Sequence, residues 1–229
     1  MSFSNGPKGI VTDGLVFAVD AGNAQSYTSG SATTTDILKG AQGTVDNTIT
    51  FNSANGGYWE FDGTNSDIAF GAQTAGQWST NPCTYEFVFQ TYGGGHTIWM
   101  DRPLYNGSTG VQMWTEGSSP NIYFRARGSS ATMVDTGGIY DTNTWYHMVW
   151  RFDGTTLTLF VNGSQVTSGT ITSVANSTSN SYIGTYVDAA GAGNEGFNGE
   201  IALMRIYHKA LTQAEVTQNY NSQKTRFGL

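Results

Sequence analysis

The stretch Asn143–Gly163, NTWYHMVWRFDGTTLTLFVNG, decides how this chain folds. It holds two runs rich in aromatic and β-branched residues, Trp145–Phe152 and Thr155–Val161, separated by Asp153-Gly154. Asp-Gly and Asn-Gly between such runs indicate tight β-hairpin turns, because the turn residues need positive φ angles. Asn162-Gly163 repeats this signal and leads into a third, more polar run. The stretch therefore predicts three consecutive antiparallel strands.

The same pattern continues on both sides of this stretch. In Thr84–Gln90, the apolar residues Tyr85, Phe87 and Phe89 alternate with polar ones, as in a strand with one buried face. Turn signals recur about every ten residues, which is typical of sandwiches and jelly rolls. We expect an all-β fold, a two-sheet antiparallel jelly-roll sandwich. Further strands are predicted over Leu15–Val19, Asn121–Arg127, Tyr182–Gly184 and Ile201–His208.

One short C-terminal helix is also predicted. Thr212–Glu215 is a capping box, in which the threonine hydroxyl and the glutamate carboxylate each bind a free backbone N–H group. Leu211 and Val216 are spaced for a hydrophobic staple around this cap. We expect the helix to pack on an edge or an end of a sheet. The tail Lys224–Leu229 shows no periodicity.

Composition excludes several classes of protein. The chain has 229 residues with 30 glycines, 12% charged residues and 13% aromatic residues, so its low charge does not indicate disorder. Its net charge of −7, with only 10 Lys and Arg, argues against a nucleic-acid partner. The single cysteine, Cys83, rules out a disulfide framework.

The chain is predicted to form one domain over residues 12–229, preceded by a flexible N-terminal arm over residues 1–11. No apolar run has the length of a signal peptide or a membrane span. We therefore expect synthesis in a cytoplasm and no membrane partner. Edge strands of a sandwich favour pairing between copies, so a homo-oligomer is one expectation.

The run Trp145-Tyr146-His147, followed by Asp153-Gly154-Thr155 and Phe160-Val161-Asn162-Gly163, resembles the concanavalin A-like lectin/glucanase superfamily and its laminin G-like domains. The resemblance covers most of the chain from about Leu15 onward, and it implies two curved antiparallel sheets in a jelly roll. Other segments that carry it are Tyr58–Asp67, Tyr182–Gly184, Phe197–Ile201, Arg205–Tyr207 and Ala210–Val216.

The two ends of the chain are similar to a narrower group. Gly9–Asn23 and Asn219–Leu229 resemble the corresponding segments of tailed-bacteriophage structural proteins. The resemblance implies a jelly-roll domain carried on a virion, with other virion proteins of the capsid or fibre as partners. The absence of a signal peptide agrees with this expectation.

Hydrolysis is not favoured. The glucanases of the superfamily resemble one another in a Glu-x-Asp-x-x-Glu or Glu-x-Asp-x-Glu strand that supplies two carboxylates to one face, and this chain has no such run. Its glutamates are scattered one at a time, and Glu86 and Glu116 are the two candidates for catalysis. His147 is interpreted as a structural imidazole, and Cys83 as a small half-buried residue. We expect no enzymatic activity.

The resemblance also implies a calcium site at a loop rim, because many relatives hold this ion with oxygen ligands. The candidate ligands lie in glycine-rich loops, and the competing interpretation is that they are solvated loop residues. These candidates are Asp101, Asp188, Asn194 and Glu195.

Carbohydrate recognition needs aromatic faces for sugar C–H surfaces, with amides and acids for hydroxyl groups. Trp99 and Trp114 lie in alternating segments, where packing in the core is the competing interpretation. Tyr105 and Tyr186 lie next to glycine-rich loops. The full set of candidates is Trp99, Tyr105, Asn106, Trp114, Tyr186 and Asn194.

Three functions remain open from the sequence. The first is a non-enzymatic virion surface module, a capsid decoration or fibre-associated protein, that binds cell-surface or environmental glycans. The second is a lectin module not tied to a virion. The third is a glycan hydrolase.

Overall fold

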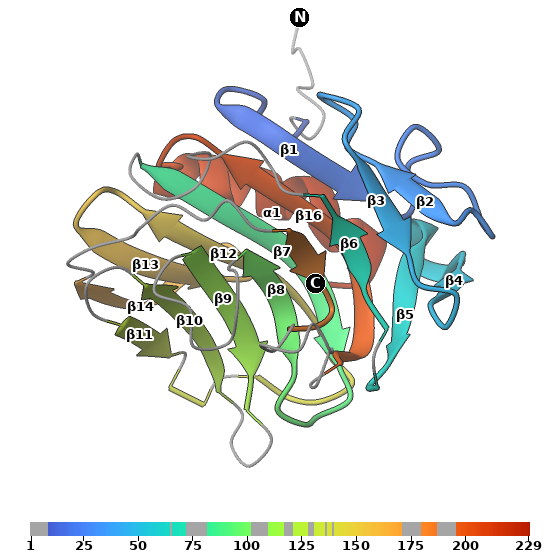
Figure 1. The fold of residues 1–229 in the computed structure, drawn as a ribbon. Coiled ribbons are helices and arrows are strands. Elements are labelled where there is room, and N and C mark those ends of the chain that lie inside the picture. The colour runs from blue at the N-terminus through green and yellow to red at the C-terminus, as the bar shows by residue number, and fades with distance from the viewer. Residues whose placement is uncertain are drawn as a thin grey trace, which may run out of the picture.

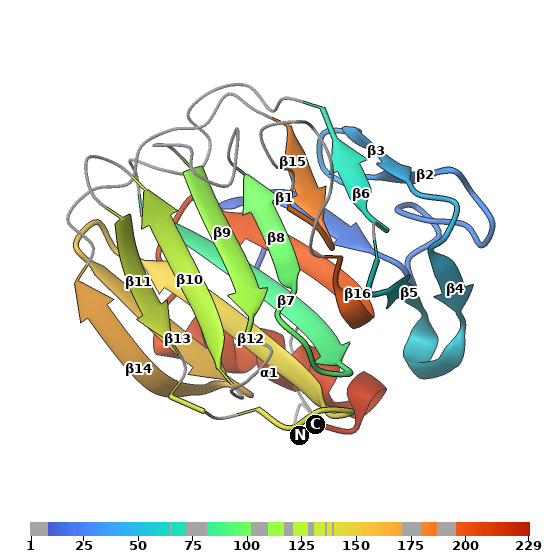
Figure 2. The same cartoon turned by 60° about the horizontal axis from the view of Figure 1, so that its bottom comes forward.

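The computed structural model describes residues 9–64, 66–71, 82–101, 110–116, 121–127, 131–135, 137–138, 140–170, 180–186 and 196–229. Figures 1 and 2 show two antiparallel sheets packed face to face, with one helix across the outside of one of them. This arrangement confirms the predicted two-sheet antiparallel sandwich with one C-terminal helix.

Sheet 1 has the strand order β14-β13-β12-β7-β16-β5-β4, and β1 also pairs with β16. A 3-10 turn, η1 (Ala54–Gly56), connects β4 to β5. The strands of sheet 1 are β1 (Leu15–Asp20), β4 (Thr50–Asn52), β5 (Tyr58–Asp62), β7 (Cys83–Thr91), β12 (Trp145–Phe152), β13 (Thr156–Val161), β14 (Ser164–Thr170) and β16 (Asn198–Tyr207).

Sheet 2 has the order β11-β10-β9-β8-β15-β6-β3-β2. Its strands are β2 (Thr33–Thr35), β3 (Gln42–Val45), β6 (Ile68–Phe70), β8 (Thr97–Asp101), β9 (Gly110–Thr115), β10 (Ile122–Arg127), β11 (Ala131–Asp135) and β15 (Ser181–Ile183).

The hairpins predicted from Asn143–Gly163 are present. β12 has the predicted bounds, and it pairs with β13, which pairs in turn with β14. At the second turn, Asn162 and Gly163 have φ angles of 49° and 78°, the positive values that an Asn-Gly hairpin turn requires. The core between the sheets is aromatic, and Trp59, Trp99 and Trp150 are each at most 1% exposed.

Helix α1 (Gln213–Phe227) begins with the predicted capping box, since Thr212 accepts from the Glu215 amide and Glu215 binds the Thr212 amide. The prediction of an edge or end location is wrong. The helix lies on the outer face of sheet 1 (Figure 2), where Val216 packs with Val149 and Phe160. The reason is that the outer face of sheet 1 carries apolar residues such as Val88, Val149 and Leu203 beside its polar ones, and these need a cover.

Both termini of the described chain are fixed against this layer. Val11 is 7% exposed, and its N–H donates to Asn219 Oδ1 at 2.8 Å. Gln218 Nε2 donates to the carbonyl of Gly9 at 2.7 Å. The last residues of the predicted arm, 9–11, therefore belong to the packed chain, whereas residues 1–8 lie outside the described part.

The C-terminal tail is helical up to Phe227, although its sequence shows no periodicity. Gly228 ends the helix with a φ of 68°, a left-handed conformation that glycine adopts readily. The Arg226 guanidinium binds the Asp20 carboxylate at 2.8 and 2.9 Å. The paired charges hold the end of α1 to the end of β1. In the described part of the chain, no helix is long and apolar enough to cross a membrane.

Candidate functional site

The first nominated carboxylate, Glu86, lies at the centre of a buried polar network between sheet 1 and α1. Its side chain is fully buried. One carboxylate oxygen accepts from Arg205 Nη1 at 2.9 Å and from His147 Nε2 at 3.0 Å. The other accepts from Asn219 Nδ2 at 2.8 Å and from the Tyr207 hydroxyl at 3.1 Å. Glu86 therefore faces the helix and not a cleft.

The charge of Glu86 is stabilised by these partners. Burial alone would raise the pKa of this carboxyl group, but the Arg205 guanidinium and the hydrogen bonds from His147 and Tyr207 lower it to about 2. The His147 ring serves as a donor within the network, in line with its structural interpretation. An ionised carboxylate with four donors and no exposed surface has no acceptor position left for a substrate.

Cys83 is also part of the core. It is 4% exposed, and burial raises the pKa of its thiol to about 12. Because the thiolate is the reactive form of cysteine, this residue is chemically inert at neutral pH.

The fold pairs two other carboxylates that the sequence shows as isolated. Glu60 on β5 lies directly opposite Glu200 on β16, on the outer face of sheet 1. The Tyr92 hydroxyl donates to Glu200 Oε1 at 2.5 Å, and Tyr58 also hydrogen-bonds to Glu200. Burial raises the pKa of Glu200, and the negative charge of Glu60 adds to this effect. The sequence gives no signal of this pair, because 140 residues separate its members.

Glu60 is held on its other side by β4. Thr50 Oγ1 donates to Glu60 Oε2 at 2.6 Å, and Asn52 Nδ2 donates to Glu60 Oε1 at 3.0 Å. These bonds fix one carboxylate beside the other. The pair is thus an ordered feature of the β4–β5–β16 region, in which the pKa of Glu200 is raised.

We predict that Glu60→Gln, relative to the wild type, is more stable at pH 8 than at pH 4 by about 0.2–1 kcal/mol, because like charges directly opposite each other on adjacent strands repel. This electrostatic gain is set against the loss of one of the two bonds from Thr50 and Asn52. Because the pKa of Glu200 is raised in the folded chain, the protonated form of Glu200 favours folding. This contribution to stability is fully present below about pH 4.5 and is lost as the pH rises through the folded-state pKa. The gain should therefore be seen at pH 8 and vanish at pH 4 in urea denaturation. Glu116→Gln is the control. An equal gain at both pH values would contradict the interpretation.

The outer face of sheet 2 carries an aromatic pair. Trp114 on β9 lies opposite Tyr123 on β10, and the two rings stack with centroids 5.0 Å apart and planes 13° from parallel. Both side chains are partly exposed. The Tyr123 hydroxyl donates to Glu116 Oε2 at 2.7 Å, and Asn121 Nδ2 approaches the same hydroxyl at 3.3 Å. This Trp114–Tyr123 pair joins a flat apolar surface to a carboxylate and an amide.

Trp99, in contrast, is not a surface residue. It is 1% exposed, and it packs in the core near Phe17. A shift of register between Thr97 and Trp99 is the cause, since Thr97 pairs with Trp114 whereas Trp99 pairs with the buried Met113. Such a bulge moves the following side chain to the opposite face of the sheet. Trp99 therefore has no face to offer to a ligand.

Most of the other predicted site residues lie outside the residues that the structure describes. Tyr186 is partly exposed just after β15, and Asp101 ends β8. No group of three or more His, Cys, Asp or Glu side chains suited to a metal ion occurs among the described residues. The calcium site stays a prediction, because most of its ligands fall elsewhere in the chain. The predicted residues outside the described ranges are Tyr105, Asn106, Asp188, Asn194 and Glu195.

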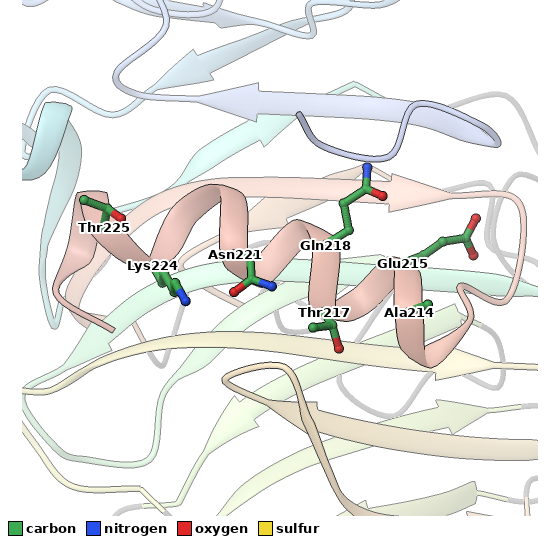
Figure 3. Close-up of a pocket in the computed structure, with 7 residues that line it drawn as sticks. All are labelled: Ala214, Glu215, Thr217, Gln218, Asn221, Lys224 and Thr225. Carbon is green, nitrogen blue, oxygen red and sulfur yellow. The ribbon is translucent and has the colours of Figure 1, made fainter. Parts of the chain in front are cut away.

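Two adjoining hollows lie along α1. One, of about 580 Å³, follows the outward side of the helix from Ala214 to Thr225 (Figure 3). The other, of about 440 Å³, lies between the helix and the β13–β14 hairpin. They meet at Thr217 and Asn221, which line both.

The two sheets, their strand order and the covering helix define a lectin-like jelly roll. A family model described as the concanavalin A-like lectin/glucanases superfamily matches residues 62–217. The chain belongs to this superfamily. No curated protein matches the sequence.

Several solved structures are similar to the chain. One is the binding domain of paraclostridial mosquitocidal protein 1, with 15% identity, a TM-score of 0.69 and coverage of 91% of this chain and 52% of that one. Another is the binding domain of botulinum neurotoxin DC in complex with SialylT, with 11% identity, a TM-score of 0.69 and coverage of 92% and 52%. The chain thus spans about half the length of these toxin domains.

A third similar structure is domain 4 of AbnA, an extracellular arabinanase from Geobacillus stearothermophilus, in complex with arabinotriose. The identity is 18%, the TM-score is 0.67, and the match covers 90% of this chain and 98% of that domain. At these identities the three comparisons show a shared fold. The superfamily name itself includes both lectins and glucanases, so membership alone does not decide between binding and catalysis.

Proposed function

We propose that this chain is a non-catalytic module that recognises carbohydrate on the surface of a virion. The observation that carries the carbohydrate part is the Trp114–Tyr123 pair beside Glu116. Each ring turns one face to the other, so the parts of the two side chains that stay exposed present the apolar surface for the C–H face of a sugar. The nearby carboxylate and the Asn121 amide supply acceptors and a donor for sugar hydroxyl groups.

Binding is favoured over catalysis because the two nominated carboxylates do not act as a pair. Glu86 is buried beneath α1 with four donors, and Glu116 lies on the other sheet. Two of the similar structures are complexes, one with SialylT and one with arabinotriose. These complexes support carbohydrate as the ligand class.

A glycan array probed with and without a chelator tests the carbohydrate part. We expect binding to at least one glycan. If this binding is lost when a chelator is added, the result would also support the predicted calcium site. Absence of binding under both conditions would contradict carbohydrate recognition and leave a purely structural role.

The virion part rests on the resemblance of both ends of the chain to tailed-bacteriophage structural proteins. The fold joins these two ends, since Gly9 and Val11 hydrogen-bond to Gln218 and Asn219. The proposed partners are other virion proteins of the capsid or fibre. The segment before Gly9 is the proposed attachment element, because it continues from a point that is anchored on the helix.

Deletion of Ser2–Lys8 is expected to abolish incorporation into particles and to leave the fold intact, because Gly9 and Val11 keep their bonds to α1. Incorporation is measured by quantitative mass spectrometry of purified virions, and folding by thermal denaturation. Undiminished incorporation of the shortened chain would show that the segment is not the attachment element.

A glycan hydrolase is the second candidate, and the Glu60–Glu200 pair favours it. Glycosidases use two carboxyl groups, one kept protonated and one ionised. Reducing-sugar release by the wild-type protein that disappears in Glu60→Gln and in Glu200→Gln would establish this activity. The proposed binding role predicts no release by any of the three proteins.

A further inference from the structure

The open hollow between the β13–β14 hairpin and α1 has the volume of a small-molecule site. Its volume of about 440 Å³ lies within the range of about 300–1,000 Å³ that is usual for ligand pockets. Helix α1 and the β13–β14 hairpin belong to the side of sheet 1, whereas β9 and β10, which carry the Trp114–Tyr123 pair, belong to sheet 2 (Figure 2). The side chains that matter for the chemistry of the hollow are Asn162, Ser164, Gln165, Gln213, Tyr220 and Asn221.

The walls of this hollow are fixed by contacts that do not depend on a ligand. Gln213 Nε2 donates to the carbonyl of Gly163 at 2.7 Å, which ties the helix to the hairpin turn. Asn162 Oδ1 accepts from the backbone N–H of His147 at 3.0 Å. Gly163 lies so close to the Tyr220 ring that an added Cβ would come within 2.9 Å of it. A preformed site avoids much of the entropy cost of binding.

Within the described part of the chain, Ser164, Gln165, Tyr220 and Asn221 have no side-chain hydrogen-bond partner. Each hydroxyl or amide supplies both a donor and an acceptor. Figure 3 shows Thr217 and Asn221 projecting from the same side of α1, towards the hairpin. These groups converge from the hairpin on one side and from the helix on the other.

The lining carries no charge among the described residues. The nearest cation on the same helix is the Lys224 ammonium, 5.8 Å from the centre of the Tyr220 ring. A divalent cation needs carboxylate or carbonyl ligands, and a phosphate needs positive charge, so neither suits this lining. Amides, hydroxyls and one aromatic ring instead match a neutral ligand rich in hydroxyl groups.

We propose that this hollow is a second carbohydrate site, for neutral saccharides, independent of the Trp114–Tyr123 pair. The inference shares the ligand class of the proposed function but rests on different residues. The adjoining hollow of about 580 Å³ begins at Thr217 and Asn221 and continues along the helix, which gives room for a chain longer than one sugar.

The test is an NMR titration of isotope-labelled protein with maltotriose, cellotriose and arabinotriose, followed by the side-chain amide signals of Asn and Gln. We expect saturable shifts of the Asn221 and Gln165 signals with at least one trisaccharide. In Trp114→Ala the backbone shifts along α1 and the hairpin should persist. In the double variant Gln165→Ala, Asn221→Ala the affinity should fall about 5- to 150-fold, since each lost hydrogen bond contributes about 0.5–1.5 kcal/mol.

Both replaced residues are exposed and unbonded, so the double variant should keep the thermal stability of the wild type. Tyr220→Phe removes one hydroxyl and should give a smaller loss of affinity. Shifts confined to the Trp114 region would overturn the second site and leave the proposed function standing. No shift at Asn221 or Gln165 with any trisaccharide, or a shift with inorganic phosphate instead, would likewise overturn it.

Discussion

Glu86→Gln is expected to lower the free energy of unfolding by about 3–5 kcal/mol, the usual cost of removing one partner from a buried ion pair. The Arg205 guanidinium, 5% exposed, would keep its charge but lose its counter-ion. Glutamine also has a single acceptor oxygen, whereas Glu86 accepts from four donors. The side-chain NH2 group of the glutamine would point at N–H or O–H groups, and two donors cannot form a hydrogen bond with each other.

The same variant has a defined dependence on pH. The pKa of Glu86 is about 2 in the folded chain against an ordinary 4.5, so its stabilisation is complete above about pH 4.5 and is lost as the pH falls towards 2. The stability difference between wild type and variant should therefore narrow over this range. Chemical denaturation at several pH values measures it.

Glu116→Gln is the matched control for this experiment. Glu116 is partly exposed and accepts one bond from Tyr123, so its replacement should cost less than about 1 kcal/mol. A loss in Glu86→Gln no greater than in this control would show that the buried network contributes little to stability. Reducing-sugar release abolished by Glu86→Gln in a folded protein would contradict the structural role of the residue.

Trp99→Ala is expected to cost about 3–5 kcal/mol, because it opens a cavity in the core between the sheets. Trp114→Ala removes a partly exposed ring, and the loss of its stacking on Tyr123 should cost about 0.5–1.5 kcal/mol. For carbohydrate binding we expect the opposite ranking, with the larger effect in Trp114→Ala. Trp114→Ala should abolish binding at the Trp114–Tyr123 pair, whereas folded Trp99 variants should retain it.

The two tryptophans thus serve as controls for each other. Urea denaturation gives their stabilities, and the glycan array gives their binding. Trp99→Phe preserves most of the core volume and keeps the comparison possible if Trp99→Ala does not fold. Equal stabilities of the two alanine variants would contradict the placement of Trp99 in the core. Because the second proposed site could also bind glycans, the binding comparison is made in the Gln165→Ala, Asn221→Ala background, and unchanged glycan binding on adding Trp114→Ala there would contradict the Trp114–Tyr123 site.

Features that depend on neighbours in the sequence could be predicted. The Asn162-Gly163 turn follows from the conformational preferences of two adjacent residues, and the strand before it from alternation of side chains. The start of α1 follows from the spacing of Thr212 and Glu215. The location of α1 was harder, because both sheet edges and the outer face of sheet 1 were open to it. Only the pairing of the strands brings Val88 and Val149 together on the outer face, in the surface that the helix covers.

The candidate sites depend on contacts between distant segments, and these were not visible in the sequence. Glu86 and Asn219 are 133 positions apart, and their contact turns a candidate catalytic carboxylate into a buried structural one. Glu60 and Glu200 meet only because β5 pairs with β16. Trp99 and Trp114 both lie in segments where polar and apolar residues alternate, so the sequence does not distinguish them. The bulge of β8 places Trp99 in the core, whereas Trp114 stays on the outer face of sheet 2.

The sequence by itself determined the longer strands such as β7, β12 and β13, the hairpin turns, the helix cap and membership of a jelly-roll class, because backbone preferences and side-chain periodicity act over a few residues. The tertiary structure alone decided which carboxylates are buried, which are paired and which aromatic rings reach the surface. These properties depend on strand register and on the layer above each face. A shift of one residue in register exchanges the core and the solvent for every side chain that follows.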